Sequence, residues 1–324
     1  MNIPATIITI ALASTVAGAQ ELGGMLNPRL GELVPRLSLD TEYYADQGID
    51  DQDADLGFTR YRLTALLPLA QNERGEAGLA AGFEAIDLAT RAALQNPQAP
   101  LPDHLYDLRL GGFKRWRVGQ DRIAAIGATI GSTSDRPFDS LEEVTLDITA
   151  GYWIPTEGRN GHIFLLNYSS NREFLPHIPI PGYGYLYRPD PNLTLFTGLP
   201  ATLLRWRIAP AWQIEASYVI PRTVFAEIQF KPLEPLAFYA NFAWDNDRWY
   251  RADRQDEDDR IFYYEKRVSA GLRLQLADRL QLDLGGGYGF DRFFFEGEEY
   301  SDRSQNRISV GDGPFLAAEA RLTF

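Results

Sequence analysis

Apolar and polar residues alternate one by one along several long stretches of this chain. From Tyr264 to Leu276, most of the residues at every second position are apolar, and the residues between them are polar or glycine. The stretch from Leu280 to Phe290 repeats this pattern after the short connection 277–279. Because successive side chains of a strand point to opposite faces, each stretch predicts a strand with one apolar and one polar face.

The same alternation recurs near residues 106–110, 144–154, 236–244 and 316–324. Segments of about ten alternating residues separated by turns are typical of a transmembrane β-barrel. The alternative is a soluble β-sandwich, in which the apolar faces meet in a core. Aromatic residues at the strand ends favour the barrel, because Tyr and Trp prefer the membrane–water boundary. The residues expected at that boundary are Trp116, Trp206, Trp212, Tyr218, Trp244, Tyr288 and Phe324.

Short turns alternate along the chain with longer polar loops, as they do in a barrel with short turns on one side of the membrane. The longer loops are expected near 45–57, 90–103, 134–142, 172–182, 247–260 and 295–312. Counting the strands between them predicts an all-β fold, a single antiparallel barrel of sixteen strands, with twelve or fourteen as alternatives. The weak point is the interval from Leu193 to Trp212, which must hold two strands and two turns. A membrane strand usually needs about 9–11 residues, so this pair must be short or miscounted.

The first nineteen residues have no charged side chain and read MNIPATIITIALASTVAGA. An apolar stretch of this length before small residues predicts a cleavable signal peptide, with cleavage before Gln20. The sequence therefore divides into a signal peptide at 1–19, an N-terminal periplasmic segment at 20–35 and a barrel at 36–324. No later segment has 18 consecutive apolar residues, so we expect no helical membrane span.

The last strand, 316–324, alternates and ends on Phe324. Such a strand is similar to the recognition signal of bacterial outer-membrane proteins, and it predicts a contact with the outer-membrane assembly machinery. Three further stretches read IPGYGYLYRPDPNLTLFTGLP, APAWQIEASYVIP and DDRIFYYEKRVSAGLRLQLADRLQLDLGGGYGFDRFFFEGEEY. With them, the chain from about Ser140 onward resembles a family of uncharacterised, porin-like outer-membrane β-barrel proteins of Gram-negative bacteria. The resemblance implies a barrel in the outer membrane and no catalytic residues.

Composition excludes several other classes of protein. The chain has no cysteine, which rules out disulfides, thiolate metal sites and a cysteine nucleophile. Its formal charge of −13 makes it a poor general binder of nucleic acid, since phosphate contacts need a basic surface. We expect no cofactor.

Charges of both signs fall on the predicted inner face of the barrel. Opposed Arg and acidic rows would screen solutes by charge and size across a water-filled lumen, whereas a closed ion-pair network would fill a narrow barrel. A sixteen-strand barrel is wide enough for an aqueous channel. The sequence thus predicts a porin-like passive channel for small hydrophilic solutes, with a narrow, plugged barrel of structural or surface-binding role as the alternative. The residues expected to line the pore are Arg60, Arg62, Asp107, Arg109, Arg115, Arg117, Asp147, Arg205, Arg207, Glu215, Glu227, Glu265, Arg267, Arg273 and Asp283.

Acidic loops and isolated histidines offer two weaker hypotheses. Asp51, Asp53 and Asp55 match the start of an EF-hand, but Arg62 occupies its last ligand position, so we expect no metal site. An enzyme acting on lipid or peptide would need His162 and Ser170 together, and their spacing along one strand separates them. We therefore expect no enzyme. The expected partners are outer-membrane lipid and lipopolysaccharide, with a homo-oligomer possible.

Overall fold

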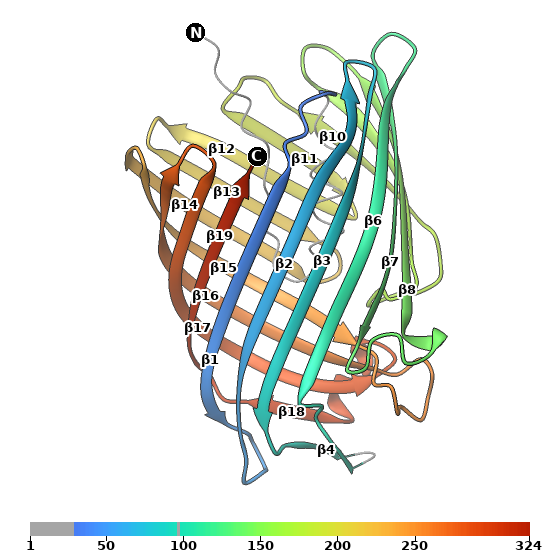
Figure 1. The fold of residues 1–324 in the computed structure, drawn as a ribbon, viewed down its shortest axis with the longest axis vertical. Coiled ribbons are helices and arrows are strands. Elements are labelled where there is room, and N and C mark those ends of the chain that lie inside the picture. Colours follow the sequence, from blue (N-terminus) through green and yellow to red (C-terminus); the bar gives the residue numbers. More distant parts are fainter. Residues whose placement is uncertain (1–28, 96–97) are drawn as a thin grey trace.

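In the computed structural model, residues 29–95 and 98–324 are described, and they form one antiparallel β-barrel (Figure 1). The predicted signal peptide lies outside the described residues. The first ten strands are β1 (Arg36–Gly48), β2 (Asp55–Asn72), β3 (Gly75–Thr90), β4 (Ala93–Gln95), β5 (Gln98–Pro100), β6 (His104–Val118), β7 (Arg122–Ser134), β8 (Val144–Pro155), β9 (Gly161–Ser169) and β10 (Ile180–Tyr187). The others are β11 (Leu193–Leu199), β12 (Ala201–Ala209), β13 (Trp212–Val219), β14 (Thr223–Leu233), β15 (Leu236–Trp249), β16 (Arg260–Ala277), β17 (Leu280–Gly297), β18 (Arg307–Val310) and β19 (Gly313–Thr323). Two short 3-10 helices are η1 (Leu141–Glu143) and η2 (Tyr300–Ser304).

The barrel closes between its first and last strands. β1 pairs with β2 on one side and with β19 on the other, in register from Arg36 opposite Thr323 to Tyr44 opposite Phe315. β18 and β19 both pair with β17 and form one interrupted wall strand, while β4 and β5 form a separate hairpin. The wall therefore has sixteen strands, which confirms the predicted fold and strand number.

The two ends of the barrel differ in the length of their connections. At one end, which we call the turn end, β2 joins β3 through 73–74 and β16 joins β17 through 278–279. At the other, the loop end, longer segments such as 91–103 and 170–179 join the strands. Arg36 and Thr323 both lie at the turn end, so the chain enters and leaves the wall on the same side.

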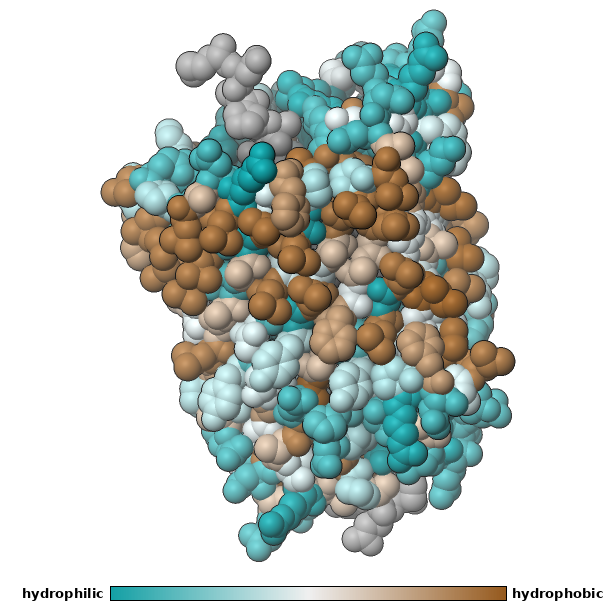
Figure 2. All heavy atoms as spheres, in the orientation of Figure 1, coloured by the Kyte–Doolittle hydropathy of each residue, from teal (hydrophilic) through white to brown (hydrophobic). Residues whose placement is uncertain are grey.

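The outer surface of the wall is apolar. Large side chains such as Leu39, Leu110 and Ile130 have 50%, 58% and 54% of their surface exposed on the outside. Figure 2 shows apolar residues gathered in a band across this face of the barrel, with polar residues toward both ends. An exposed belt of this kind is suited to contact with hydrocarbon rather than with water.

One sector of the wall is much lower than the rest. β10–β13 have seven to nine residues each, whereas β16 and β17 have eighteen each. At the loop end β11 and β12 are joined through Pro200 alone, and β13 and β14 through 220–222. We call β10–β13 the short wall. It resolves the crowded interval from Leu193 to Trp212, which does hold two short strands.

The loop-end half of β15 leaves its neighbour and crosses the barrel. β14 pairs with β15 only as far as Val224 opposite Trp244, although β15 continues to Trp249. β16 and β17 follow β15, and Figure 1 shows these three long strands sweeping across toward the side of β6–β8. The sequence placed 247–260 and 295–312 in loops; this was partly wrong, because β15 and β17 extend into them and β18 lies within the second.

Candidate functional site

A group of buried ion pairs joins opposite walls of the barrel. Arg60 on β2 bonds Asp247 on β15, with 2.9 Å between Nη2 and Oδ2. Arg267 on β16 reaches Glu42 on β1 at 2.7 Å and Asp245 on β15 at 3.1 Å. β17 and β19 separate β16 from β1 along the wall, and β15 is farther still from β2, so the Arg267–Glu42 and Arg60–Asp247 contacts cross the lumen, whereas Asp245 and Arg267 lie on neighbouring strands. We call these five residues the cross-barrel cluster.

Aromatic side chains lie beside this cluster, toward the loop end. The Tyr44 and Phe58 rings stack at 4.2 Å, and Tyr263 meets Phe58 edge-on at 5.7 Å. The hydroxyls of Tyr44 and Tyr263 both donate to Glu265, at 2.6 and 2.8 Å. These side chains belong to a buried apolar cluster that includes Leu94 of the β4–β5 hairpin. The space between β1–β6 and β15–β19 is therefore filled at the loop end.

Backbone hydrogen bonds close the loop end further. Tyr250, directly after β15, donates from its amide to the Thr133 carbonyl of β7 at 2.9 Å, and its carbonyl accepts from the Asp135 amide at 3.3 Å. Ser134 and Tyr250 thus form a parallel bridge between strands on opposite sides of the barrel. We call this the β15–β7 bridge, and it divides the loop-end mouth in two.

A polar cavity of about 520 Å³ occupies the turn end. Within it, Arg205 bonds Glu215 at 2.9 Å, and Arg273 bonds Glu227 at 2.7 Å. Arg273 also bonds Asp283 at 2.6 Å. Glycine in the neighbouring wall leaves room for Tyr239, because a Cβ at Gly271 or Gly285 would collide with the Tyr239 hydroxyl. This cavity has the charged lining that the sequence predicts for a lumen.

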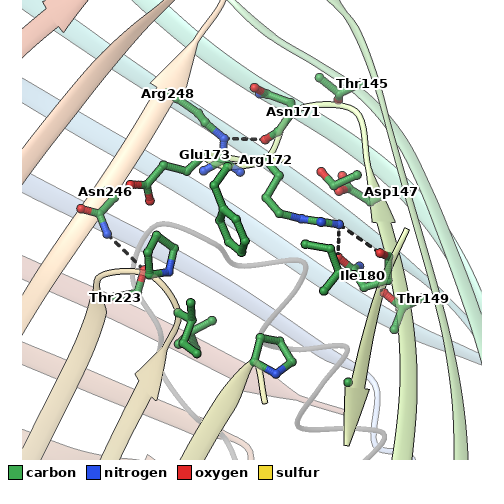
Figure 3. Close-up of a pocket in the computed structure, with 18 of the residues that line it drawn as sticks. Thr145, Asp147, Thr149, Asn171, Arg172, Glu173, Ile180, Thr223, Asn246 and Arg248 are labelled. Carbon is green, nitrogen blue, oxygen red and sulfur yellow. Dashed lines mark hydrogen bonds between the residues drawn. The ribbon is translucent and has the colours of Figure 1, made fainter. Parts of the chain in front are cut away.

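A second cavity, of about 180 Å³, lies at the loop end on the other side of the β15–β7 bridge. Figure 3 shows its lining, with side chains converging from the wall at Asp147 and Thr149, from the loop after β9 and from β15. The Arg172 guanidinium donates to Asn167 Oδ1 at 2.7 Å. Arg248 Nε donates to the Asn171 carbonyl. Polar groups thus cover one side of this cavity.

The opposite side of the loop-end cavity is apolar. It is formed by Leu165 of β9, Ile180 of β10 and the turns of the short wall at Pro200 and 219–221. Leu165 also belongs to a buried cluster with Phe196 and Leu203, whose side chains face inward from the short wall. The loop-end cavity is therefore polar toward β8, β15 and the loop after β9, and apolar toward β9 and the rim of the short wall.

The segment before β1 lies in the turn-end opening. The Gly31 amide donates to Glu76 on β3 at 2.8 Å, and Glu76 bonds Arg115 on β6 at 2.8 Å. Arg115 also donates to the Arg29 carbonyl at 3.2 Å. Residues 29–33 therefore contact the wall of the barrel at this end.

In the turn between β10 and β11, burial and the charges of Arg29 and Arg159 lower the pKa of Arg188 to about 10.

The predicted pore residues fall into separate groups. Five of them line the turn-end cavity, and Asp283 bonds Arg273, which is one of the five. Arg109 and Asp147 line the loop-end cavity. Arg62 bonds Glu84 at 2.8 Å in the interior, and Arg109 bonds Asp107. Arg117 lies at the turn end with 37% of its side chain exposed, near the carbonyls of Glu73 and Gln120. The five turn-end residues are Arg205, Arg207, Glu215, Glu227 and Arg273.

Sequence reasoning missed several interior residues. Asp247 and Arg248 were assigned to a loop, and Arg172 was assigned to another, so none was expected inside. The available signal was the aromatic runs at 262–264 and 293–295, which do not alternate. Runs of this kind indicate strands covered on both faces, and these strands are buried on both faces because they cross the barrel.

The predicted boundary aromatics lie on the outside of the wall or at its ends. Trp206 and Trp212 are 45% and 39% exposed near the turn end, where the Trp212 ring lies 4.6 Å from the tilted ring of Phe230. Tyr218 and Tyr288 are 44% and 46% exposed farther toward the loop end. Phe324 is 57% exposed. Trp116 and Trp244 are half-buried under the ammonium groups of Lys114 and Lys266.

The structure does not bring the candidate hydrolytic residues together. His162 contacts the Tyr183 hydroxyl at 2.8 Å, while the Ser170 hydroxyl accepts from the Leu146 amide at 2.8 Å. Over residues 29–95 and 98–324, no group of three or more His, Asp or Glu side chains is placed to hold a metal ion. In the same part of the chain, no helix has the length and apolar character needed to cross a membrane.

Comparisons with known proteins find only distant structural similarity. No family model and no curated protein matches the chain, so the resemblance in the sequence has no family assignment. Pseudomonas aeruginosa OccK7 (OpdD) is 11% identical, with 90% of this chain and 100% of that chain covered and a TM-score of 0.40. The Pseudomonas putida toluene transporter TodX is 8% identical, with 90% of each chain covered and a TM-score of 0.37. The Acinetobacter baumannii outer membrane protein Omp33 is 7% identical, with 90% and 99% covered and a TM-score of 0.35. These values carry no argument about function, which rests on the geometry above.

Proposed function

We propose that this protein is an outer-membrane channel for small solutes, whose loop-end mouth is narrowed by the β15–β7 bridge. The observation that carries the proposal is a closed barrel with an apolar exterior and a charged cavity of about 520 Å³ inside its turn end. The polar interior of a membrane β-barrel is either a water-filled channel or is plugged by parts of the chain, and a cavity of this size favours the channel. Short turns at one end and longer loops at the other favour a bacterial outer membrane, with the turn end in the periplasm.

The bridge distinguishes this channel from an open porin. Its two backbone hydrogen bonds and the cross-barrel cluster hold β15 against β2 and β7. A solute that enters from the loop end must pass on the short-wall side or displace β15. We therefore expect a low conductance, which increases when β15 is released from β7.

The second candidate is a plugged barrel with a structural or surface-binding role. The buried cluster of Tyr44, Phe58 and Tyr263 favours it, because it fills the loop end between β1–β6 and β15–β19. The two candidates differ in one property, which is whether ions pass through the purified protein. Contact with outer-membrane lipid, assembly through the last strand and association into a homo-oligomer remain proposals for either candidate.

The experiment measures conductance in planar bilayers while a reversible disulfide holds the β15–β7 bridge closed. The chain has no cysteine, so the pair Ser134→Cys and Tyr250→Cys gives one possible disulfide across the bridge. We expect measurable conductance with the pair reduced and a several-fold decrease when it is oxidised. Each single cysteine variant is the control and must not respond to oxidant.

Equal conductance of the two redox forms would show that β15 does not gate the channel. The absence of conductance in the wild type and in the reduced pair, from protein that retains its strand content, would replace the channel with the plugged barrel.

A further inference from the structure

Two arginines in the loop-end cavity differ from most interior arginines. Arg60, Arg267 and Arg273 each bond a carboxylate at 2.9 Å or less. Arg172 and Arg248 line the cavity and, within the part of the chain that the structure describes, have no carboxylate oxygen within 4.0 Å. Their hydrogen bonds go to uncharged carbonyl and amide oxygens. The two guanidinium charges are therefore not neutralised by direct contact.

The electrostatics of the loop after β9 agree with this geometry. Burial lowers the pKa of the Arg172 guanidinium, and the charge of Arg248 lowers it further, whereas the charge of Asp147 raises it. Glu173 also lines the cavity, but it bonds Arg222 at 2.6 Å and accepts from the Tyr264 hydroxyl at 2.6 Å. Counting Arg109, the lining carries three positive and two negative side chains. One positive charge remains, which suits a monoanion.

The rest of the lining suits an apolar group. Leu165, Ile180, Val219 and Ile220 face the cavity from the short wall and its rim. An anion without an apolar part would leave this side uncovered, and a purely apolar molecule would leave the arginines unpaired. Apolar walls with a few convergent polar groups are the usual composition of small-molecule sites.

The rim of the cavity lies low in the wall. The seven residues of β11 extend about 23 Å along the strand and about 16 Å along the barrel axis at a tilt of about 45°. The apolar band of such barrels is about 25 Å tall. The rim therefore lies inside the membrane, where the apolar parts of amphipathic molecules concentrate. Leu199 and Ile178, beside the rim, are 61% and 49% exposed.

We propose that the loop-end cavity binds a small amphipathic monoanion, an organic acid whose carboxylate lies between Arg172 and Arg248 and whose apolar body packs on the short wall. Planar guanidinium groups pair with carboxylates through two parallel hydrogen bonds, which gives this site its preference for an acid over an alcohol. The inference that such acids are substrates of the channel rests on the proposed function. The inference that the cavity binds them does not depend on it.

The test is titration calorimetry of hexanoate with the full-length mature protein, refolded in a zwitterionic detergent at low chloride concentration. Acetate has the carboxylate without the long apolar chain, and hexanol has the apolar chain without the charge. We expect hexanoate to bind at least about tenfold more tightly than either. Arg172→Gln and Arg248→Gln should each raise the Kd for hexanoate about tenfold or more, the effect of one charge-assisted hydrogen bond. Arg279→Gln, in the exposed 278–279 turn, is the matched control and should leave the Kd unchanged.

Two independent arginine variants keep the test decisive if one of them fails to fold. Equal binding of hexanoate and hexanol, or unchanged affinity in the folded variants, would overturn the inference. Binding that depends on both arginines, in a protein without conductance, would support the site and remove the channel. Conductance without hexanoate binding would leave the channel and remove the site.

Discussion

The interior charges of this barrel are buried, and Arg60 shows how they are held. Its side chain is 1% exposed, and it lies 2.9 Å from Asp247 and 3.8 Å from Glu42. Its guanidinium also lies 5.8 Å from the centre of the Phe58 ring. A charge removed from water in this way depends on its partners, because burial alone is strongly unfavourable.

Replacing Arg60 by methionine should destabilise the barrel by about 3–5 kcal/mol, because Asp247 is left as a buried, uncompensated charge. The free energy of unfolding in urea, measured in phospholipid vesicles, checks this. The double variant Arg60→Met/Asp247→Leu is the control and should recover much of the loss, since both charges are then absent. A single variant as stable as the wild type would mean that the lumen at this site is open to water.

A pH effect is expected from Asp259, in the loop between β15 and β16. Burial, together with the nearby charges of Glu296 and Asp256, raises the pKa of this carboxyl from 3.8 to about 6. A raised pKa means that the folded loop binds more protons than the unfolded loop, so the stability of the loop should increase as the pH falls from about 7 to about 4. Hydrogen exchange of residues 251–259 measures this.

In Asp259→Asn the dependence of exchange protection on pH should be smaller, once the intrinsic exchange rates are corrected for. Asp253→Asn changes an exposed acid of the same loop and is the matched control. The explanation fails if Asp259→Asn retains the full dependence.

At the scale of single strands, alternation predicts which face is apolar but not where a strand leaves the wall. β16 alternates cleanly from Lys266 to Leu276, and this part lies in the regular wall. Beyond the irregularity between Tyr264 and Lys266, its side chains are buried on both faces. Length and alternation therefore predicted β16, whereas its path across the mouth depends on contacts with β1 and β2 and on the β15–β7 bridge.

The low height of the short wall predicts that its rim lies at the depth of the lipid acyl chains. A cysteine at Leu199, labelled with a fluorophore in this otherwise cysteine-free chain, should be quenched by lipids that carry a quencher in the acyl chain. Leu141→Cys in η1, where the leucine is 88% exposed, is the control and should be quenched from the aqueous phase only. Aqueous quenching at both positions would place the rim above the membrane.

At the scale of the whole molecule, much of the architecture follows from the sequence. The sixteen strands were expected from alternation and turn spacing. The two short strands between Leu193 and Trp212 are one of the two possibilities that the sequence left open. The cross-barrel cluster and the loop-end cavity were not expected, because they join segments such as 170–174 and 245–250 that lie far apart in the chain. A pattern within one strand carries no information about such distant pairs.

The central claim is that β15 crosses the mouth and lies against β7. The most direct measurement is disulfide formation between Ser134→Cys and Tyr250→Cys in intact cells, followed by the gel shift of the oxidised protein. Because these positions form a bridge, we expect near-complete crosslinking with mild oxidant. In a regular barrel, where β15 stays beside β14, the two positions would lie on opposite sides of the lumen. A fully assembled barrel that does not crosslink would contradict the account.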